Sequence, residues 1–260
     1  MGIHASAIVS KGAHIPKSCE IGPFCTIGKE VVLGERCRLI SHVVIDGKTR
    51  MGDDNVVFPF TTIGLPPQDL KFKGEETGIE IGNGNTFREC CTIHKGTPGG
   101  GGVTRIGNHN LIMAYCHIAH DCVVGNHNIF ANAATLAGHV EFGDYSHLPA
   151  LAPVHQFCRI GSHAFIGGHT VITQDVLPFS RTSAVRETHA FGVNSVGLER
   201  KGFSKESIRK LQKAYRLLLK SGLNTSQAIE RMREENAAHP DEHVAMLIEF
   251  IASSQRGVIK

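Results

Sequence analysis

The residues best suited to chemistry gather in one short segment, AYCHIAHDCVVGN, which contains His117, His120 and Asp121. His139 follows His120 by 19 residues and His155 follows it by 35. Imidazole has an ordinary pKa near neutral pH, so a histidine beside a carboxylate is a natural general base. The segment therefore predicts acid–base chemistry, with His120 as the base and Asp121 or a neighbouring carbonyl as the group that orients it.

Two other interpretations of these histidines remain open on sequence alone. A zinc site needs three or four ligands that converge on one point, whereas a repeat of about eighteen residues would place these histidines in a line. A structural cluster is the other interpretation, because most of the 16 histidines occupy positions where a solvent-facing or subunit-facing imidazole is ordinary. We predict no metal ligand and no cofactor.

A six-residue repeat predicts the scaffold that positions these side chains. Bulky apolar residues recur at every sixth position from Ile3 to Ile63, resume at Ile81, shift phase, and then run unbroken from Ile106 to Ile172. Neither a helix nor an alternating strand has a period of six, but a solenoid does. Three faces of about six residues make one coil of about eighteen. We therefore predict a mainly β fold, a parallel β-helix of hexapeptide repeats.

A second inward position, four residues after each bulky one, is small nearly throughout. Seven of the eight cysteines occupy this position, and Cys90 is the exception. Buried free cysteine behaves as a small apolar side chain, so we predict core spacers rather than catalytic, metal-binding or disulfide-bonded thiols. Free thiols suit a reducing, cytoplasmic setting. Glycine often follows the bulky residue, where we expect a tight corner.

Two stretches leave the repeat, residues 64–80 and 94–105. Long loops on a rigid scaffold commonly carry function. The second contains four consecutive glycines but lacks the GK[ST] ending of a phosphate-binding loop, so we expect a flexible connection. The N-terminal sequence lacks a cationic segment followed by an apolar one, and no window approaches a membrane span. We therefore predict no integral membrane segment.

Helices are predicted where the composition changes near residue 200. The first is expected to begin after Ser204 and end at Gly222, the second to follow Asn224, and the third to begin after Pro240. We divide the chain into a β-helix over 1–186 and a C-terminal helical domain over 187–260, which caps the open end of the solenoid.

The net charge of the chain gives no support to a nucleic-acid partner, but the distribution of that charge allows an acidic protein partner. A net charge of only +3 does not argue for nucleic acid. The first predicted helix and its approach are nevertheless crowded with basic residues, which form either a solvated face or a docking surface for an acidic partner. These residues are Arg200, Lys201, Lys205, Arg209, Lys210, Lys213, Arg216 and Lys220.

Several motifs together resemble one family. HIAHDCVVGN, ANAATLAGHV, VHQFCRIG, FGVNSVGLERKGFS and, in the first excursion, QDLKFKGE span essentially the whole chain. They resemble the acyl-[acyl-carrier-protein]–UDP-N-acetylglucosamine O-acyltransferase family, in family order. The resemblance implies a left-handed parallel β-helix, a hand that the periodicity does not show and that departs from the usual right-handed crossover. It also implies a homotrimer with active sites in the clefts between subunits.

The resemblance further implies a reaction and a role for each matching residue. A 3-hydroxyacyl chain would pass from acyl carrier protein to the 3-hydroxyl of UDP-N-acetylglucosamine, the first step of lipid A synthesis. His120 matches the general base, Asp121 its orienting partner, and the Gly138 backbone N–H the oxyanion donor. The thioester is already activated, so this chemistry needs no metal. The substrate residues implied are Asp69 and Lys71, reaching across from a neighbouring subunit, His117, His139, His155 and Gln156 lining the site, Asn194 and Arg200 near the nucleotide, and Gly168 where a side chain would limit acyl length.

Three stretches depart from the commoner family pattern. Pro149 and Ala150 stand in place of a Gly-Gly pair, RTSAVRETHAFG replaces the usual turn, and Val196 replaces an acidic residue near the nucleotide. The acyl length therefore stays open, as does the choice between a hydroxyl and a 3-amino acceptor.

Two alternatives compete with this reaction. The runner-up is a related hexapeptide acyltransferase such as the glucosamine N-acyltransferase of the same pathway, which usually carries an additional N-terminal domain, whereas the repeat here begins at Ile3. The alternative from a different class is a zinc-binding trimeric β-helix of the γ-class carbonic anhydrase type.

Overall fold

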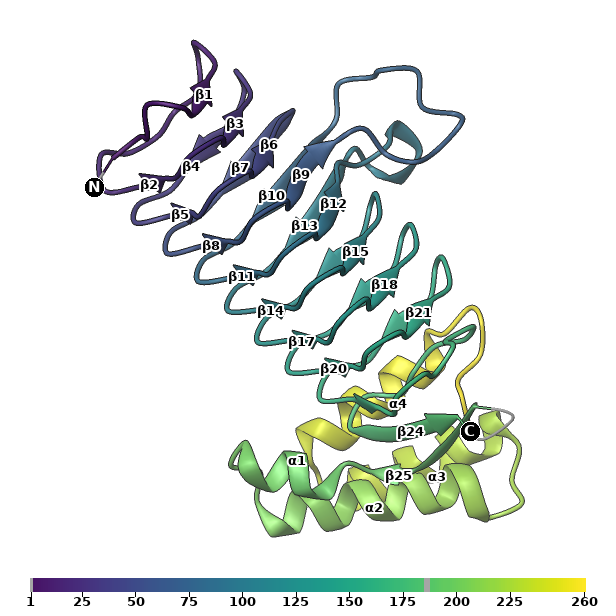
Figure 1. The fold of residues 1–260 in the computed structure, drawn as a ribbon. Helices are drawn as coiled ribbons and strands as arrows, with labels where there is room; N and C mark the ends of the chain where they lie inside the picture. The colour runs from purple at the N-terminus through teal and green to yellow at the C-terminus, as the bar shows by residue number, and fades with distance from the viewer. Residues whose placement is uncertain (1, 185–187) are drawn as a thin grey trace.

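The computed structural model describes residues 2–184 and 188–260, which form a three-sided prism closed at one end by helices (Figure 1). Each coil contributes one short strand to each face, and strands of successive coils pair in parallel, for example His117 with Thr135 and Ile118 with Leu136. The three faces are sheets of eight, seven and ten strands. The predicted parallel β-helix is therefore confirmed.

The three faces are numbered in the order in which one full coil crosses them, beginning with the face that contains β1. The first face contains β1 (Ile8–Val9), β3 (Thr26–Ile27), β6 (Val44–Ile45), β9 (Thr62–Leu65), β12 (Thr92–His94), β15 (His117–Ile118), β18 (Thr135–Leu136) and β21 (Pro153–Val154). The second contains β4 (Val32–Leu33), β7 (Lys48–Met51), β10 (Gly78–Ile81), β13 (Val103–Ile106), β16 (Val123–Val124), β19 (Glu141–Phe142) and β22 (Arg159–Ile160). The third contains β2 (Glu20–Ile21), β5 (Arg38–Leu39), β8 (Val56–Val57), β11 (Thr86–Phe87), β14 (Leu111–Ile112), β17 (Ile129–Phe130), β20 (His147–Leu148), β23 (Phe165–Ile166), β24 (Ser180–Ala184) and β25 (Thr188–Val193).

The interior of the prism contains the two predicted columns of side chains, one bulky and one small. The bulky residue of nearly every strand points inward and is buried, as at Ile45, Ile63 and Ile118. Seven cysteines are buried in the small column, and Cys90 is partly exposed. The interpretation of the cysteines as core spacers is therefore confirmed.

The residues at the corners of the prism are mostly not the glycines that were expected there. The left-handed backbone conformation at most corners belongs to residues other than glycine, such as Asp121 with φ 60° and His139 with φ 62°. The glycines after the bulky residues are instead required by the close approach of adjacent coils: a Cβ added at Gly22 would lie 1.7 Å from the carbonyl oxygen of Ile40. Close approach between coils, rather than backbone conformation, therefore explains most of these glycines, although Gly64, with φ 80°, also has the left-handed conformation.

Both excursions leave the prism at the same edge, where the chain crosses from the first face to the second. The first joins β9 to β10 and the second joins β12 to β13, so the strands extend slightly into the predicted ranges. The first stands away from the prism in Figure 1. The second contains the short 3-10 helix η1 (Pro98–Gly100) and is held by backbone hydrogen bonds to Gly78: Gly96 donates to its carbonyl over 3.1 Å, and its N–H donates to Gly102 over 2.8 Å. The expectation of a flexible connection was therefore wrong.

The C-terminal region is largely helical, as predicted. The helices are α1 (Ser195–Arg200), α2 (Lys205–Lys220), α3 (Thr225–Ala238) and α4 (Glu242–Ala252). Ser204 caps α2, and Asn224 with Gln227 forms the expected capping box on α3. Two features were not predicted, α1 and the antiparallel pairing of β24 with β25, which adds residues 188–193 to the third face. The boundary placed between residues 186 and 187 lies outside the described residues.

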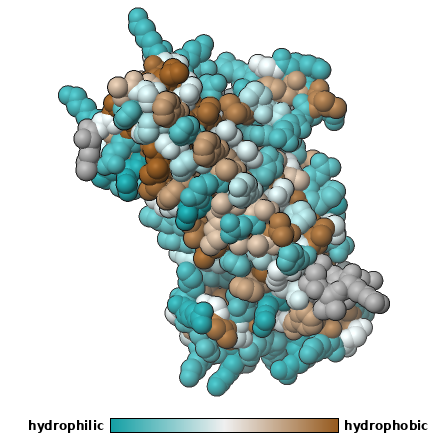
Figure 2. All heavy atoms as spheres, viewed as in Figure 1, coloured by the Kyte–Doolittle hydropathy of each residue, from teal (hydrophilic) through white to brown (hydrophobic). Residues whose placement is uncertain are grey.

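A partly buried arginine fixes the helices to the end of the prism. Arg159 of β22 donates to the Phe250 carbonyl oxygen over 2.8 Å and pairs with Asp175 over 3.2 Å. In the view of Figure 2, the helical end carries mostly hydrophilic side chains, whereas apolar side chains run along the prism. No helix among the described residues is long and apolar enough to cross a membrane.

Candidate active site

The edge between the first and second faces carries most of the predicted chemical residues, and we call it the histidine edge. His120 and Asp121 follow β15, Gly138 and His139 follow β18, and His155 follows β21 on the next coil. Both excursions cross the same edge one and two coils earlier in the chain. Histidines about one coil apart therefore do lie along one line, as the spacing predicted.

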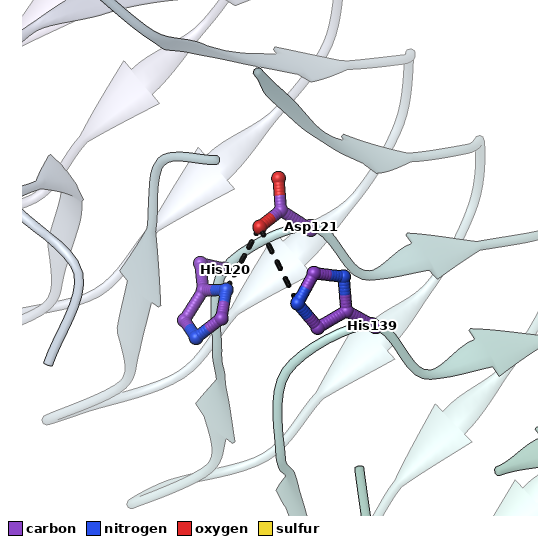
Figure 3. Close-up of side chains that lie close together, drawn as sticks. All are labelled: His120, Asp121 and His139. Carbon is purple, nitrogen blue, oxygen red and sulfur yellow. Dashed lines mark hydrogen bonds and ion pairs between the residues drawn. The ribbon is translucent and has the colours of Figure 1, made fainter. Parts of the chain in front are cut away.

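Asp121 joins two of these histidines (Figure 3). Its Oδ2 lies 2.8 Å from Nδ1 of His120 and 3.9 Å from Nε2 of His139, and its side chain is fully buried. An ionised carboxylate can only accept hydrogen bonds, so Nδ1 of His120 is the donor and its Nε2 is left with a free lone pair. This is the tautomer that a general base needs.

The second excursion holds the other side of the Asp121 carboxylate. The Thr97 backbone N–H donates to Oδ1 over 2.8 Å, and the Thr97 hydroxyl donates to Oδ2 over 2.5 Å. The backbone N–H of Asp121 donates to the Thr104 hydroxyl over 2.8 Å. Sequence reasoning missed Thr97 and Thr104, because their only signal was their position in a glycine-rich segment.

Gly138 lies directly against the ring of His120. A Cβ added at Gly138 would lie 2.6 Å from Cε1 and 2.8 Å from Nε2 of His120. Among the described residues, no acceptor takes the Gly138 backbone N–H. A backbone donor and the free Nε2 therefore lie side by side, an arrangement that can serve an attacking hydroxyl and a developing oxyanion together.

Further imidazoles surround this group in their neutral form. Burial, with the charges of His117 and His120, lowers the pKa of His94 to about 4. Burial also lowers the pKa of His117, whose Nδ1 lies 2.7 Å from the Thr92 hydroxyl, and the pKa of His139, where Asp121 opposes the shift. Neutral imidazoles can accept protons or hydrogen bonds at neutral pH. Sequence reasoning assigned no role to His94.

The predicted sugar-contacting residues lie within the first excursion. The Lys71 backbone N–H donates to Asp69 Oδ1 over 2.9 Å. The charge of Asp69 raises the pKa of His139 in the same chain, although burial and Asp121 have larger effects on it. His155 and Gln156 are exposed on the coil below. A contribution of Asp69 and Lys71 to the site of a neighbouring subunit stays a prediction.

The remaining predicted residues lie on other edges of the prism. Asn194 caps α1 by accepting the Gly197 N–H over 3.3 Å, and its amide donates to the His163 carbonyl oxygen over 3.4 Å, at the edge between the second and third faces. Arg200 is exposed at the end of α1. Gly168 is exposed at the edge between the third and first faces. One chain alone does not bring these three residues to His120.

The same cluster is also a candidate metal centre. One ligand atom each from His120, Asp121 and His139 lies within 4.8 Å of the others. Both oxygens of Asp121 already accept hydrogen bonds, two from Thr97 and one from His120, and a cation would have to displace these donors. The donor set fits a hydrogen-bonded histidine–aspartate pair better than a zinc site, which needs three or four free ligands.

Two family models match the chain. Residues 175–259 match the model described as UDP N-acetylglucosamine O-acyltransferase, domain 2, and residues 104–138 match the bacterial transferase hexapeptide model of six repeats.

Relatives match over nearly the full length. An acyl-[acyl-carrier-protein]–UDP-N-acetylglucosamine O-acyltransferase of Thermodesulfovibrio yellowstonii is 49% identical over 99% of both chains, and one of Halorhodospira halophila is 46% identical over 99% of both. Among solved structures, the UDP-N-acetylglucosamine acyltransferase of Francisella novicida superimposes with a TM-score of 0.96 at 40% identity, covering 99% of this chain and 93% of that one. The structure from Acinetobacter baumannii gives 0.95 at 45% identity, with 99% of each chain covered.

Proposed function

The chain belongs to the acyl-[acyl-carrier-protein]–UDP-N-acetylglucosamine O-acyltransferase family, and we propose that it transfers a 3-hydroxyacyl chain from acyl carrier protein to the 3-hydroxyl of UDP-N-acetylglucosamine in lipid A biosynthesis. The observation that carries the mechanism is the juxtaposition of His120 Nε2 with the backbone of Gly138, beside the His120–Asp121 hydrogen bond of 2.8 Å. The His120 imidazole can then accept a proton while the neighbouring Gly138 N–H stabilises the negative charge that develops on the substrate.

In the proposed reaction, His120 Nε2 removes the proton of the sugar hydroxyl as the oxygen attacks the thioester carbonyl carbon. The carbonyl oxygen becomes an oxyanion, which accepts the Gly138 N–H. The intermediate collapses, the carbon–sulfur bond breaks, and the imidazolium returns its proton to the leaving thiolate of the carrier. Asp121 stabilises the imidazolium and keeps the ring oriented. Base and oxyanion donor together suffice because the thioester is already activated.

We propose a homotrimer, because the prism exposes apolar side chains along one edge. Phe24, Phe60, Tyr115 and Leu151 at the edge between the third and first faces are each more than half exposed. The second face is charged by comparison: its outward residues include Arg50, Glu80, Arg105 and Glu141. Large apolar side chains exposed repeatedly along one edge are typical of an interface.

A cyclic trimer that covers this edge turns the first face of one subunit toward the third face of the next. The histidine edge of one subunit then approaches the neighbour's edge between the second and third faces, to which Asn194 is attached through His163. This supports a composite site, with Asn194 and Arg200 as nucleotide ligands from one subunit beside His120 of another. Leu70, 97% exposed between Asp69 and Lys71, gives the first excursion an apolar tip suited to packing on a neighbour.

Other substrate contacts follow from their positions. We propose that His117 and His139 line the acceptor site beside His120, and that His155 and Gln156 extend it along the same edge toward the helices. We propose that Gly168 leaves room for the acyl chain. No atom lies within 4 Å of a Cβ added there, so a larger side chain at this position could occupy that space and limit acyl length.

The acyl carrier protein is proposed to dock on α2. Lys205, Arg209, Arg216 and Lys220 are exposed and, at helical spacing, share one face of the helix. Within residues 2–184 and 188–260, no acidic partner pairs with these four, whereas Lys210 and Lys213 pair with Glu206 and Glu235. A row of unpaired cations at the end of the prism complements an acidic carrier.

An acyl-transfer assay read by mass spectrometry tests the proposal. The purified chain is offered 3-hydroxyacyl carriers of several lengths against UDP-N-acetylglucosamine and its 3-amino analogue. We expect an ester product with the first acceptor and its loss in a folded His120→Ala variant. Exclusive amide formation would assign the chain to the amino-sugar alternative. A His120→Ala enzyme that retains more than a few per cent of kcat would exclude His120 as the base.

A further inference from the structure

We propose that Thr97 and Gly100, which we call the Asp121 clamp, are positioning residues that hold Asp121 so that it keeps His120 in its catalytic orientation and tautomer. The inference rests on the proposed role of His120 as the base. Neither residue needs to touch substrate, because both act through the buried carboxylate.

The clamp fixes the Asp121 carboxylate at both of its oxygens. Thr97 donates its N–H to Oδ1 over 2.8 Å and its hydroxyl to Oδ2 over 2.5 Å. Two donors from one residue prevent the carboxylate from rotating about its Cβ–Cγ bond. One acceptor position of Oδ2 is occupied by Thr97, and the other faces Nδ1 of His120 at 2.8 Å. The hydroxyl therefore determines where the acceptor for His120 lies.

The steric fit around the carboxylate explains why a glycine is required beside Thr97. A Cβ added at Gly100 would lie 2.0 Å from Asp121 Cγ and 2.3 Å from Oδ2. The neighbouring Gly99 provides the contrast, since no atom lies within 4 Å of a Cβ added there. The segment also approaches the carboxylate at Gly96, where an added Cβ would lie 2.7 Å from Asp121 Oδ1, but the closest approach is at Gly100.

The clamp is itself anchored to the prism. Gly100 and Gly102 donate their N–H groups to the Thr97 carbonyl oxygen over 3.0 and 2.9 Å, which closes the turn that carries Thr97. Gly78 at the start of β10 binds the segment at Gly96 and Gly102. Thr97 is buried. A rigid segment tied at both ends can hold a side chain to the tolerance that catalysis demands.

In the part of the chain that the structure describes, the Asp121 carboxylate lies within ion-pair distance of two histidines. His120 lies within hydrogen-bonding distance of Oδ2, and His139 lies 3.9 Å away from it on the next coil. His120 is also close enough to His94 and His117 to lower the pKa of each. Loss of one neutral donor on Oδ2 therefore changes the hydrogen bond to His120 without removing a charge.

The test compares Thr97→Val, which keeps the shape and the backbone N–H, with Thr97→Ser, which keeps the hydroxyl. For Thr97→Val we expect kcat to fall roughly 10- to 100-fold, the effect of losing a hydrogen bond to a charged group, with both KM values within about twofold of wild type. Thr97→Ser should recover most of kcat. Gly100→Ala should resemble Thr97→Val, and Gly99→Ala should resemble wild type. An unchanged oligomer size and unfolding temperature verify the fold of each variant.

A second readout separates this inference from the proposed function. The ¹⁵N shifts of the His120 ring, assigned by their disappearance in His120→Gln, report its tautomer without any substrate. We expect protonated Nδ1 in wild type and a mixture in Thr97→Val. If wild type transfers no acyl group, the proposed function fails and the tautomer still tests the clamp. An unchanged tautomer in Thr97→Val, an unchanged kcat, or a raised KM at full kcat would each overturn the clamp.

Discussion

Replacing Gly138 by alanine should misplace the catalytic base without removing any functional group. The added Cβ would lie 2.6 Å from Cε1 of His120, whereas an ordinary carbon–carbon contact is about 3.5 Å. The ring must then retreat by about 0.9 Å. A displacement of about 1 Å can cost about 100-fold in rate, equivalent to about 2.7 kcal/mol of transition-state stabilisation. The backbone of Gly138 does not have a positive φ, so alanine brings no conformational strain of its own.

The assay for this variant measures kcat and both KM values by mass-spectrometric quantification of the acylated sugar nucleotide. We expect kcat to fall about 100-fold while the KM for the carrier stays near wild type, because the carrier is proposed to dock on α2. Gly99→Ala is the matched control, since its added methyl group meets open space. A Gly138→Ala enzyme with kcat within threefold of wild type would refute the reasoning, because the ring would then have moved without loss of function.

Three further predictions concern stability, docking and metal. Burial depresses the pKa of His94 to about 4, so its contribution to stability is complete above about pH 6.5 and is lost as the pH falls toward 4. Wild type should therefore lose about 2 kcal/mol more between pH 7 and pH 5 than His94→Gln in urea unfolding, and equal losses would contradict this. Charge reversal at Arg216 and Lys220 should raise the KM for the acyl carrier protein at low salt, whereas reversal at Lys11 and Lys17, at the far end of the prism, should not. Dialysis against a chelator should leave kcat unchanged, and activity restored only by added zinc would favour the metal alternative.

The prism could be predicted from the sequence because the period of six places a bulky apolar residue at the same inward position of nearly every strand. Ile45, Ile63 and Ile118 all occupy this inward position. A wrong choice of register would therefore have placed polar residues in the core of many coils at once. The hand of the coil came only from the resemblance, since side-chain periodicity is the same for either hand. Helix caps such as Ser204 were predictable because capping is local in sequence.

The site was harder to predict because its parts meet through contacts that no repeat encodes. His120 and Asp121 are adjacent in sequence, so their pairing could be proposed. Thr97 reaches Asp121 from 24 residues away, and the length and path of an excursion are not periodic. The glycine run was interpreted as flexible because glycine permits flexibility. In the structure the same residues permit close approach to a carboxylate instead, which sequence alone does not distinguish.

The corner that holds Asp121 explains why the excursion and the chemistry share an edge. Asp54 occupies an equivalent left-handed corner on another edge, with φ 58° against 60° for Asp121. The side chain of Asp54 is 53% exposed and pairs with Arg36 over 2.7 Å, an interaction that solvent leaves nearly without energetic value. Asp121, covered by the second excursion, is fully buried and therefore acts on His120 in a medium of lower dielectric, where the same charge has a larger effect. A regular β-helix corner cannot bury a carboxylate by itself. The excursion provides both the cover and the donors that make burial possible, and a catalytic pair can form only at a corner that has them.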